Sequence, residues 1–189
     1  MVSNCYLARL TVDDVPLLQP LEDQVKLAFW GKDNYRRFLE ECPEYFGSKA
    51  VLLSDSGEEK LIGFFLARSI YENLEILKLG VFPICQRQGI GTQLMETAYA
   101  EGMRRGCSRC FLEVRRSNQI AIQFYYNHNF RIAGTRINYY TDPIEDAWDL
   151  YRQDPASQRL HPALSDGLRL IPSVQAANGG VTIGVAARF

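Results

Sequence analysis

Short apolar runs in the first half of the chain have the length and the turn-rich borders of β-strands. They cover residues 50–53, 61–70 and 74–81, and the turn-rich stretch 54–57 separates the first two. We expect these three runs to form an antiparallel meander. A further short strand is expected before them, at residues 5–10.

Two helices are expected between the first strand and the meander. Residues 11–14 supply cap chemistry for the first helix, which tolerates Pro16 in its first turn. Pro20 should kink or divide this helix. The second helix should cover residues 34–41 and end before Pro43, because the residue before a proline avoids helical angles.

After the meander the hydrophobic period changes to that of helices. Apolar side chains recur at helical spacing over residues 90–103, and Gly106 is placed as a left-handed cap. A strand is expected at 110–114. Asn118 then begins a second helix, which ends near Asn129, a residue able to adopt the left-handed conformation.

Two last strands are expected near residues 131–140 and 147–151. The order is then strand, helices, three strands, helix, strand, helix and two strands, which predicts an α/β or α+β domain with a mixed sheet. This domain spans residues 1–152. Residues 153–189 are rich in Pro, Ser, Gln, Ala and Gly and show no sustained period, so we expect an appended, partly disordered tail.

The composition favours one globular domain. The chain has 189 residues, of which 47% are hydrophobic and 23% charged, close to the average for such domains. Its formal net charge is -1, with 21 basic and 22 acidic residues. Nucleic-acid binders normally carry a basic excess, because phosphate contacts supply most of their affinity. We therefore expect no nucleic-acid partner.

Neither a membrane span nor a secretory leader is indicated. No apolar segment approaches the roughly 20 residues that cross a bilayer, and residues 1–9 lack a basic region followed by an apolar one. Five cysteines, an odd number, suit a reducing compartment. We expect a cytoplasmic protein without a membrane partner, and the sequence does not indicate its oligomeric state.

Cys107 and Cys110 match a Cys-x-x-Cys spacing. A zinc site would need a second pair of ligands, which the remaining cysteines do not form. In a strand, the two side chains would also face opposite sides. We therefore expect core or surface thiols and no metal.

The stretch from Gln86 to Thr92 is the most informative motif. It follows a strand and opens a helix, and its two glycines let successive backbone N–H groups converge on an anion. The helix N-terminus adds unsatisfied N–H groups and its dipole, and Arg87 adds a positive charge. A pyrophosphate-bearing ligand is expected, although the motif fits neither the Rossmann nor the Walker pattern.

This motif and the segments after it resemble the GNAT superfamily of acyl-coenzyme-A N-acyltransferases, whose signature is Gln/Arg-x-x-Gly-x-Gly/Ala. The match covers about residues 4–152, with departures at Lys78, Asn129 and Asp149. The closer resemblance is to RimI-type enzymes, which acetylate the N-terminal alanine of a ribosomal protein. It is carried by residues 29–30, 112–115, 117–118, 121–125, 129–130, 135–140 and 145–147.

The resemblance implies a fold, a co-substrate and its binding residues. The fold is a mixed, mostly antiparallel, splayed sheet flanked by helices, and the co-substrate is acetyl-coenzyme A (acetyl-CoA). Its pantetheine arm would pair with the backbone of Leu79, Gly80 and Val81, and Asn118 would contact the cofactor. The pyrophosphate would lie on Arg87, Gln88, Gly89, Ile90, Gly91 and Thr92, and Gln86 would also bind the cofactor.

The resemblance also implies a catalytic base at Glu113 and a catalytic acid at Tyr125. Partial burial of Glu113 in its apolar strand would raise its pKa and make it a better base at neutral pH, acting directly or through water. The alternative is an outward-facing carboxylate in a salt bridge. Tyr125 is protonated at pH 7 and could donate to a thiolate, and the alternative is a packed tyrosine.

The acceptor is expected to be an amine on a protein N-terminus. An α-amine with a pKa of about 7.8 is roughly 10% neutral at pH 7, whereas a lysine is a few hundred-fold less so. Candidates for the peptide groove are Trp30, Arg136, Tyr139 and Tyr140, although strand alternation places only one of the two tyrosines on a given face. A lysine, a polyamine, an antibiotic amine and a non-catalytic coenzyme-A-binding module remain alternatives.

Overall fold

The computed structural model describes residues 4–27 and 30–153. Its seven strands form one sheet in the order β1-β2-β3-β4-β5-β7-β6. Every neighbouring pair is antiparallel except β4 and β5, which are parallel. The strands are β1 (Cys5–Arg9), β2 (Tyr45–Leu53), β3 (Glu59–Ile70), β4 (Asn73–Val81), β5 (Arg109–Arg115), β6 (Arg131–Thr141) and β7 (Ile144–Gln153).

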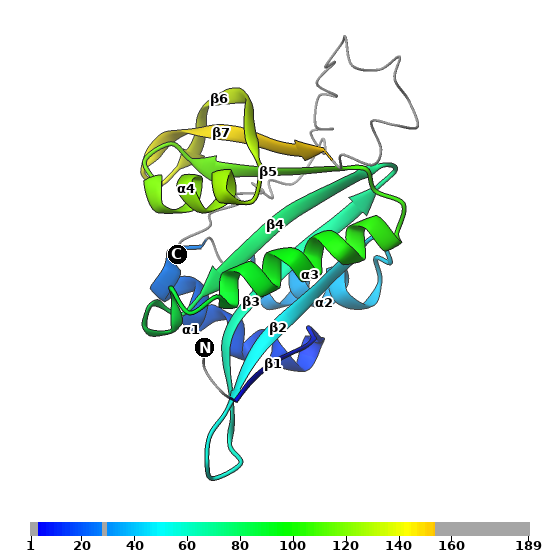
Figure 1. Cartoon of the computed structure of the whole chain (residues 1–189), viewed down its shortest axis with the longest axis vertical. Helices are drawn as coiled ribbons and strands as arrows, with labels where there is room; N and C mark the ends of the chain where they lie inside the picture. Colours follow the sequence, from blue (N-terminus) through cyan, green and yellow to red (C-terminus); the bar gives the residue numbers. More distant parts are fainter. Residues whose placement is uncertain (1–3, 28–29, 154–189) are drawn as a thin grey trace.

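Helices cover both faces of this sheet. Figure 1 shows α3 across one face of β2, β3 and β4, with α1 and α2 on the other face. The expected mixed, mostly antiparallel sheet flanked by helices is confirmed. The helical segments are the short 3-10 helices η1 (Val12–Asp14) and η2 (Pro83–Cys85), and the α-helices α1 (Val15–Val25), α2 (Lys32–Glu40), α3 (Ile90–Arg104) and α4 (Gln119–Asn127).

Of the two effects predicted for Pro20, a kink or a division of the first helix, the division does not occur. Pro20 lies inside α1, which continues to Val25 and ends where Lys26 takes a left-handed conformation at φ 52°. A proline removes one backbone hydrogen bond and disturbs the helix around it. Here Leu18 and Leu21 flank Pro20 and are fully buried, so packing on both sides of the proline outweighs the local preference.

The predicted cap residues are confirmed. The Asn118 side chain accepts a hydrogen bond from the backbone N–H of Ala121 at 3.2 Å and so caps α4. Asn129 follows α4 with φ 65°, and Gly106 follows α3 with φ 87°. Both residues let the chain leave a helix in the left-handed conformation.

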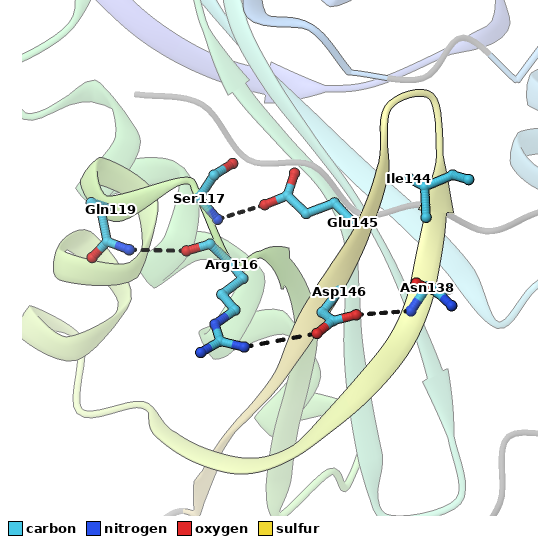
Figure 2. Close-up of a pocket in the computed structure, with 7 residues that line it drawn as sticks. All are labelled: Arg116, Ser117, Gln119, Asn138, Ile144, Glu145 and Asp146. Atoms are coloured by element: carbon cyan, nitrogen blue, oxygen red, sulfur yellow. Dashed lines mark hydrogen bonds and ion pairs between the residues drawn. The ribbon is translucent and has the colours of Figure 1, made fainter.

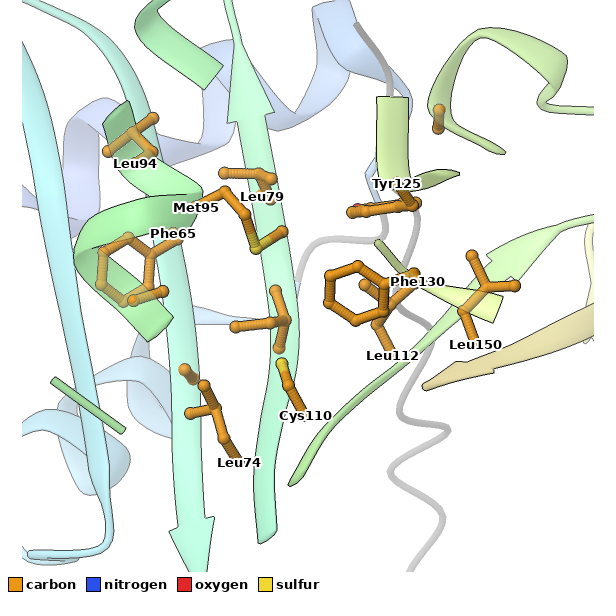
Figure 3. Packing of buried hydrophobic residues seen from close by; sticks show 14 of the residues in the cluster. Phe65, Leu74, Leu79, Leu94, Met95, Cys110, Leu112, Tyr125, Phe130 and Leu150 are labelled. Carbon is orange, nitrogen blue, oxygen red and sulfur yellow. The ribbon is translucent and has the colours of Figure 1, made fainter. Parts of the chain in front are cut away.

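Each face of the sheet has its own hydrophobic core. On one face, residues of α3 and α4 pack on the central strands, and Figure 3 shows Phe65, Leu79 and Met95 on one side of this core and Leu112 and Phe130 on the other. On the opposite face, α1 and α2 cover β3 and β4 with a separate buried cluster. The two cores fix the directions in which the side chains of β4 and β5 point.

The parallel strands β4 and β5 pair over only a short length. Their register runs from Asn73 opposite Arg109 to Glu75 opposite Phe111, whereas β4 stays paired with β3 as far as Val81. Beyond Glu75 the two strands diverge toward the side where α4 lies (Figure 1). The expected splay is thus present, and one edge of β4 faces it.

The strand β7 ends at Gln153, one residue past the predicted end of the domain. The rest of the predicted C-terminal tail lies outside the described residues, as does Phe29 of the segment 29–30.

Candidate active site

The predicted phosphate loop turns sharply into α3. Arg87 and Gly89 both have positive φ angles, 61° and 85°, and Gly89 is the N-cap of α3. The Gln86 side-chain amide donates to the Val81 carbonyl at 3.0 Å, and that of Gln88 donates to the Ile84 carbonyl at 3.1 Å. These bonds hold the loop in one shape, in which the first turn of α3 can receive an anion.

A cleft of about 460 Å³ opens between this loop and α4. Six of the predicted cofactor residues line it: Val81, Gln86, Arg87, Gly89, Gly91 and Thr92. The other five do not line the cleft. The Gln88 side chain bonds to Ile84, and Ile90 is buried in the core. Leu79 and Gly80 precede Val81 on β4, and Asn118 caps α4.

One face of α4 forms the second wall of the cleft, and sequence reasoning missed it. Its lining residues are spaced by three or four positions, as expected for one side of a helix. That spacing was a usable signal, because it places three amide side chains and the exposed Ile120 on one side of the helix, beside Phe124, which is partly buried against the core. They are Gln119, Ile120, Gln123, Phe124 and Asn127.

The end of β4 presents backbone to the diverging strands. Leu79, Gly80 and Val81 pair with β3 on one side, and their other edge faces the splay. A side chain at Gly80 would meet the Leu21 side chain at 2.9 Å. A glycine is therefore needed for α1 to pack directly on the part of β4 that leaves β5.

Glu113 lies on β5 and faces away from the core that contains α3 and α4. Its neighbours Leu112 and Val114 are buried in that core, so the alternation of the strand directs Glu113 to the other face. One of its carboxylate oxygens is 3.0 Å from an Arg136 guanidinium nitrogen. The Nε of Arg136 donates to Asp149 at 2.7 Å, so the arginine bridges the two acids.

Burial raises the pKa of the Glu113 carboxyl to about 7. Arg136 opposes this shift, and the negative charge of Asp149 reinforces it. A carboxyl with this pKa is a competent base at neutral pH. The arrangement combines the two alternatives from the sequence, since Glu113 has both the raised pKa of a base and an ion-pair partner.

Three residues that modulate Glu113 were not predicted as site residues. The first is Asp149, whose negative charge raises the pKa of Glu113. The other two, Glu75 on β4 and Arg68 on β3, form an ion pair at 2.6 Å. Glu75 raises the pKa of Glu113 and Arg68 lowers it. The pairing of strands brings these residues together, and no local spacing in the sequence indicates it.

Tyr139 and Tyr140 both reach this region. Their rings meet edge to face with centroids 5.2 Å apart, and burial followed by the charge of Glu113 raises the pKa of both phenols. The regular alternation on which the prediction of one tyrosine per face depends does not hold here. Asn138 has φ 52°, and the β6–β7 register shifts between Arg136 and Tyr140, which interrupts regular alternation.

Tyr125 lies on the face of the sheet opposite Glu113. It is fully buried in the core of α3 and α4, and its ring centroid is 5.6 Å from that of Phe130 (Figure 3). Burial raises the pKa of its phenol well above the ordinary value. The phenol is therefore protonated at neutral pH and has an O–H to donate.

Trp30 packs in the second core instead of beside Glu113. Lys78 is fully buried there, forms an ion pair with Glu22, and places its Nζ 4.5 Å from the centroid of the Trp30 ring. Tyr35 donates a hydrogen bond to Glu22 at 2.5 Å. Burial lowers the pKa of Lys78 to about 8, and the charge of Glu22 opposes that shift.

A second hollow of about 500 Å³ lies between the turn before α4 and the β6–β7 hairpin. Glu145 accepts a hydrogen bond from the Ser117 backbone N–H at 2.6 Å (Figure 2), and it pairs with Arg115 at 3.1 Å. The Arg115 guanidinium lies 4.0 Å from the centroid of the Tyr140 ring. The hairpin that carries the tyrosines is thus fastened to the start of α4.

Cys107 and Cys110 are buried in the same core. The expectation that they face opposite sides is wrong, because Cys107 precedes β5 and strand alternation does not apply to it. Over residues 4–27 and 30–153, no group of three or more His, Cys, Asp or Glu side chains is arranged to hold a metal ion. No helix in this part of the chain is long and apolar enough to cross a membrane.

Comparison with known proteins identifies the family. The sequence profile of the acetyltransferase (GNAT) family matches residues 16–130. A ribosomal protein bS18-alanine N-acetyltransferase from Escherichia coli (strain K12) is 30% identical over 143 residues, which make up 75% of this chain and 92% of that enzyme. The predicted resemblance to this group of enzymes is therefore confirmed.

Solved structures agree on the fold. The ribosomal-protein-S18-alanine N-acetyltransferase from Escherichia coli superposes with a TM-score of 0.67 at 26% identity, covering 79% of this chain and 93% of that one. Arabidopsis thaliana NAA60 in complex with acetyl-CoA superposes with a TM-score of 0.70 at 18% identity, covering 80% and 100%. The chain therefore belongs to the acetyltransferase (GNAT) family of enzymes.

Proposed function

We propose that this enzyme transfers an acetyl group from acetyl-CoA to the α-amine of a protein N-terminus, with a ribosomal protein as the acceptor. The observation that carries the proposal is Glu113, a carboxyl with a pKa of about 7 on the face of the sheet opposite the phosphate cleft. The similarity to the bS18-alanine acetyltransferase supports the choice of acceptor. A ribosomal-protein acceptor would also place the enzyme in the cytoplasm.

The cofactor would enter from the cleft. The loop from Gln86 to Thr92, with Arg87 as its positive charge, would hold the pyrophosphate, and the free edge of β4 at residues 79–81 would receive the pantetheine arm. The thioester would then lie where β4 and β5 diverge. A backbone N–H of Leu79 or Val81 is available there to polarise the carbonyl.

The acceptor amine would approach from the Glu113 face. Glu113 would take a proton from the amine, directly or through a water molecule, and so leave it able to attack the carbonyl. Arg136 pairs with the carboxylate, and Tyr139 and Tyr140 lie near enough for its charge to raise their pKa values. These three residues would hold the peptide backbone. The involvement of Trp30, which lies in the second core, remains a prediction from the sequence.

Tyr125 would assist the departing sulfur from the other face. Its phenol is a weaker acid than a thiol, so it would keep its proton and stabilise the departing thiolate by donating a hydrogen bond to it. This assistance is modest, because a thiolate is already a good leaving group.

The acceptor assignment is tested by thiol release from acetyl-CoA. We expect turnover with a peptide that begins with alanine and has its lysines blocked, and none with a peptide whose α-amine is blocked and whose lysine is free. Lysine turnover alone would contradict the α-amine assignment. Tight coenzyme-A binding without turnover on either peptide would favour a small amine or a non-catalytic role.

Replacing Tyr125 by phenylalanine should lower kcat about a hundredfold, the low end of general-acid effects. The ring and its packing on Phe130 are kept, so the dissociation constant of acetyl-CoA should stay near that of the wild type. Steady-state kinetics and calorimetry measure the two quantities. Tyr126→Phe, one position along α4, is the matched control and should keep full turnover, and an unchanged kcat in Tyr125→Phe would rule out the donor role.

A further inference from the structure

His128 lies directly after α4, half-buried, and does not itself line the phosphate cleft. Its backbone N–H donates to the carbonyls of Phe124 and Tyr125 at 3.2 and 3.0 Å. These bonds fix the residue at the end of the helix, so the position of its imidazole is set by the backbone of α4.

The imidazole contacts both walls of the cleft. Its Nε2 is 3.3 Å from Oγ1 of Thr92, which lies in the first turn of α3. Its ring centroid is 4.4 Å from that of Phe124 on α4. Thr92 and Phe124 both line the cleft, so one side chain behind the cleft supports a residue from each wall.

The imidazole is held mainly neutral. Burial lowers the pKa of His128, the positive charge of Arg152 on β7 adds to this, and Glu96 on α3 opposes it. A neutral imidazole has one N–H and one lone pair. At neutral pH, its bond to the Thr92 hydroxyl is therefore an ordinary hydrogen bond that does not require a positive charge.

We propose that His128 is a positioning residue for the cofactor: it holds Thr92 and Phe124 where the phosphates of acetyl-CoA are bound. The inference rests on the proposed function, because it requires that this cleft bind the cofactor. The cleft lies between the start of α3 and one face of α4, so a bond that links the two helices beside it helps to fix its width. The His128–Thr92 bond supplies such a link directly behind the binding surface.

The test compares two acetyl donors. Acetyl-CoA uses the phosphate cleft, whereas acetylpantetheine carries the same thioester without a pyrophosphate. In His128→Phe the ring remains against Phe124 and the bond to Thr92 is lost. We expect kcat/KM for acetyl-CoA to fall about three- to tenfold through KM, with kcat unchanged, and kcat/KM for acetylpantetheine to stay at the wild-type value.

Two further variants keep the test decisive if His128→Phe folds poorly. Thr92→Val removes the same hydrogen bond from the other side and should raise the KM for acetyl-CoA. In His128→Gln a side-chain amide replaces Nε2 at similar reach, and this variant should recover most of the affinity. If Thr92→Val and His128→Phe act through one bond, the double variant should lose less than the two single losses multiplied together.

The outcomes separate this inference from the proposed function. Equal losses with both donors would show that His128 only supports the fold, and wild-type values with both would show that it has no role, so either result overturns the proposal. Calorimetry of the wild type with coenzyme A tests the underlying assignment. No binding there would overturn the cofactor site itself, whereas binding with an unaffected His128→Phe would overturn only the role of His128.

Discussion

Replacing Gly89 by glutamate is expected to raise the dissociation constant of coenzyme A about a thousandfold or more. The N-cap of α3 is where phosphate oxygens would meet the helix N-terminus. A carboxylate at this position would occupy that space and repel the phosphates, and like charges in contact cost several kcal/mol. Isothermal titration of coenzyme A into the purified variant measures the effect.

Gly106 offers a matched control at the other end of the same helix. Gly89 and Gly106 have φ angles of 85° and 87°, and a side chain at either position would meet nothing within 4 Å. Gly89→Glu and Gly106→Glu should therefore each lose about 1–2 kcal/mol of folding free energy from backbone strain. Only Gly89→Glu should lose coenzyme-A binding, and equal affinity in the two variants would refute the phosphate-loop assignment.

The sequence predicted the structure correctly where the conformation depends on a few adjacent residues. The two-glycine loop, the asparagine cap at Asn118 and the left-handed exit at Gly106 each depend on a few adjacent residues, and the structure has all three where expected. The prediction that Pro20 could divide α1 failed because the helix-breaking tendency of proline competes with the burial of its neighbours. Leu18 and Leu21 pack on both sides of it, and the energy of that packing is not visible in the local pattern.

The surroundings of Glu113 could not be obtained from the sequence in the same way. The sequence left open whether Glu113 is a partly buried base or an outward-facing carboxylate in a salt bridge, and its charged partners come from four other strands. The order β3-β4-β5-β7-β6 places Arg68, Glu75, Asp149 and Arg136 around it. These contacts depend on strand order and register, which one sequence without an observed pairing does not determine.

Glu113→Gln should lower kcat about a hundredfold to ten-thousandfold while making the folded protein more stable at pH 8. The loss of turnover follows from removing the base. The stability effect follows from the pKa of Glu113, which is about 7 in the folded protein and near 4.5 as an ordinary carboxyl. Between these values the folded state binds more protons than the unfolded state, so wild-type stability falls as the pH rises from about 4.5 to 7.

A glutamine carries no titrating proton and does not show this decline. Above pH 7 the variant should therefore exceed the wild type by up to about 3 kcal/mol, and Arg136 keeps its hydrogen bond to Asp149. Urea unfolding at pH 5 and pH 8 measures the difference, which should be small at pH 5. If Glu113 were chiefly a structural ion-pair partner, the substitution would destabilise the protein at pH 8.

Glu145 supplies a control of opposite sign. Its side chain is 19% exposed, as is that of Glu113. Burial acts to raise its pKa, but the bonds from Ser117 and Arg115 outweigh burial and hold the pKa below its ordinary value. Its contribution to stability is therefore present above about pH 4.5 and lost as the pH falls, so Glu145→Gln should destabilise the protein at pH 8. A carboxylate that stabilises the fold should behave like Glu145, so that its substitution by glutamine lowers stability at pH 8. We expect Glu113 to lower stability at pH 8 instead, and its presence is then explained by its role as the base.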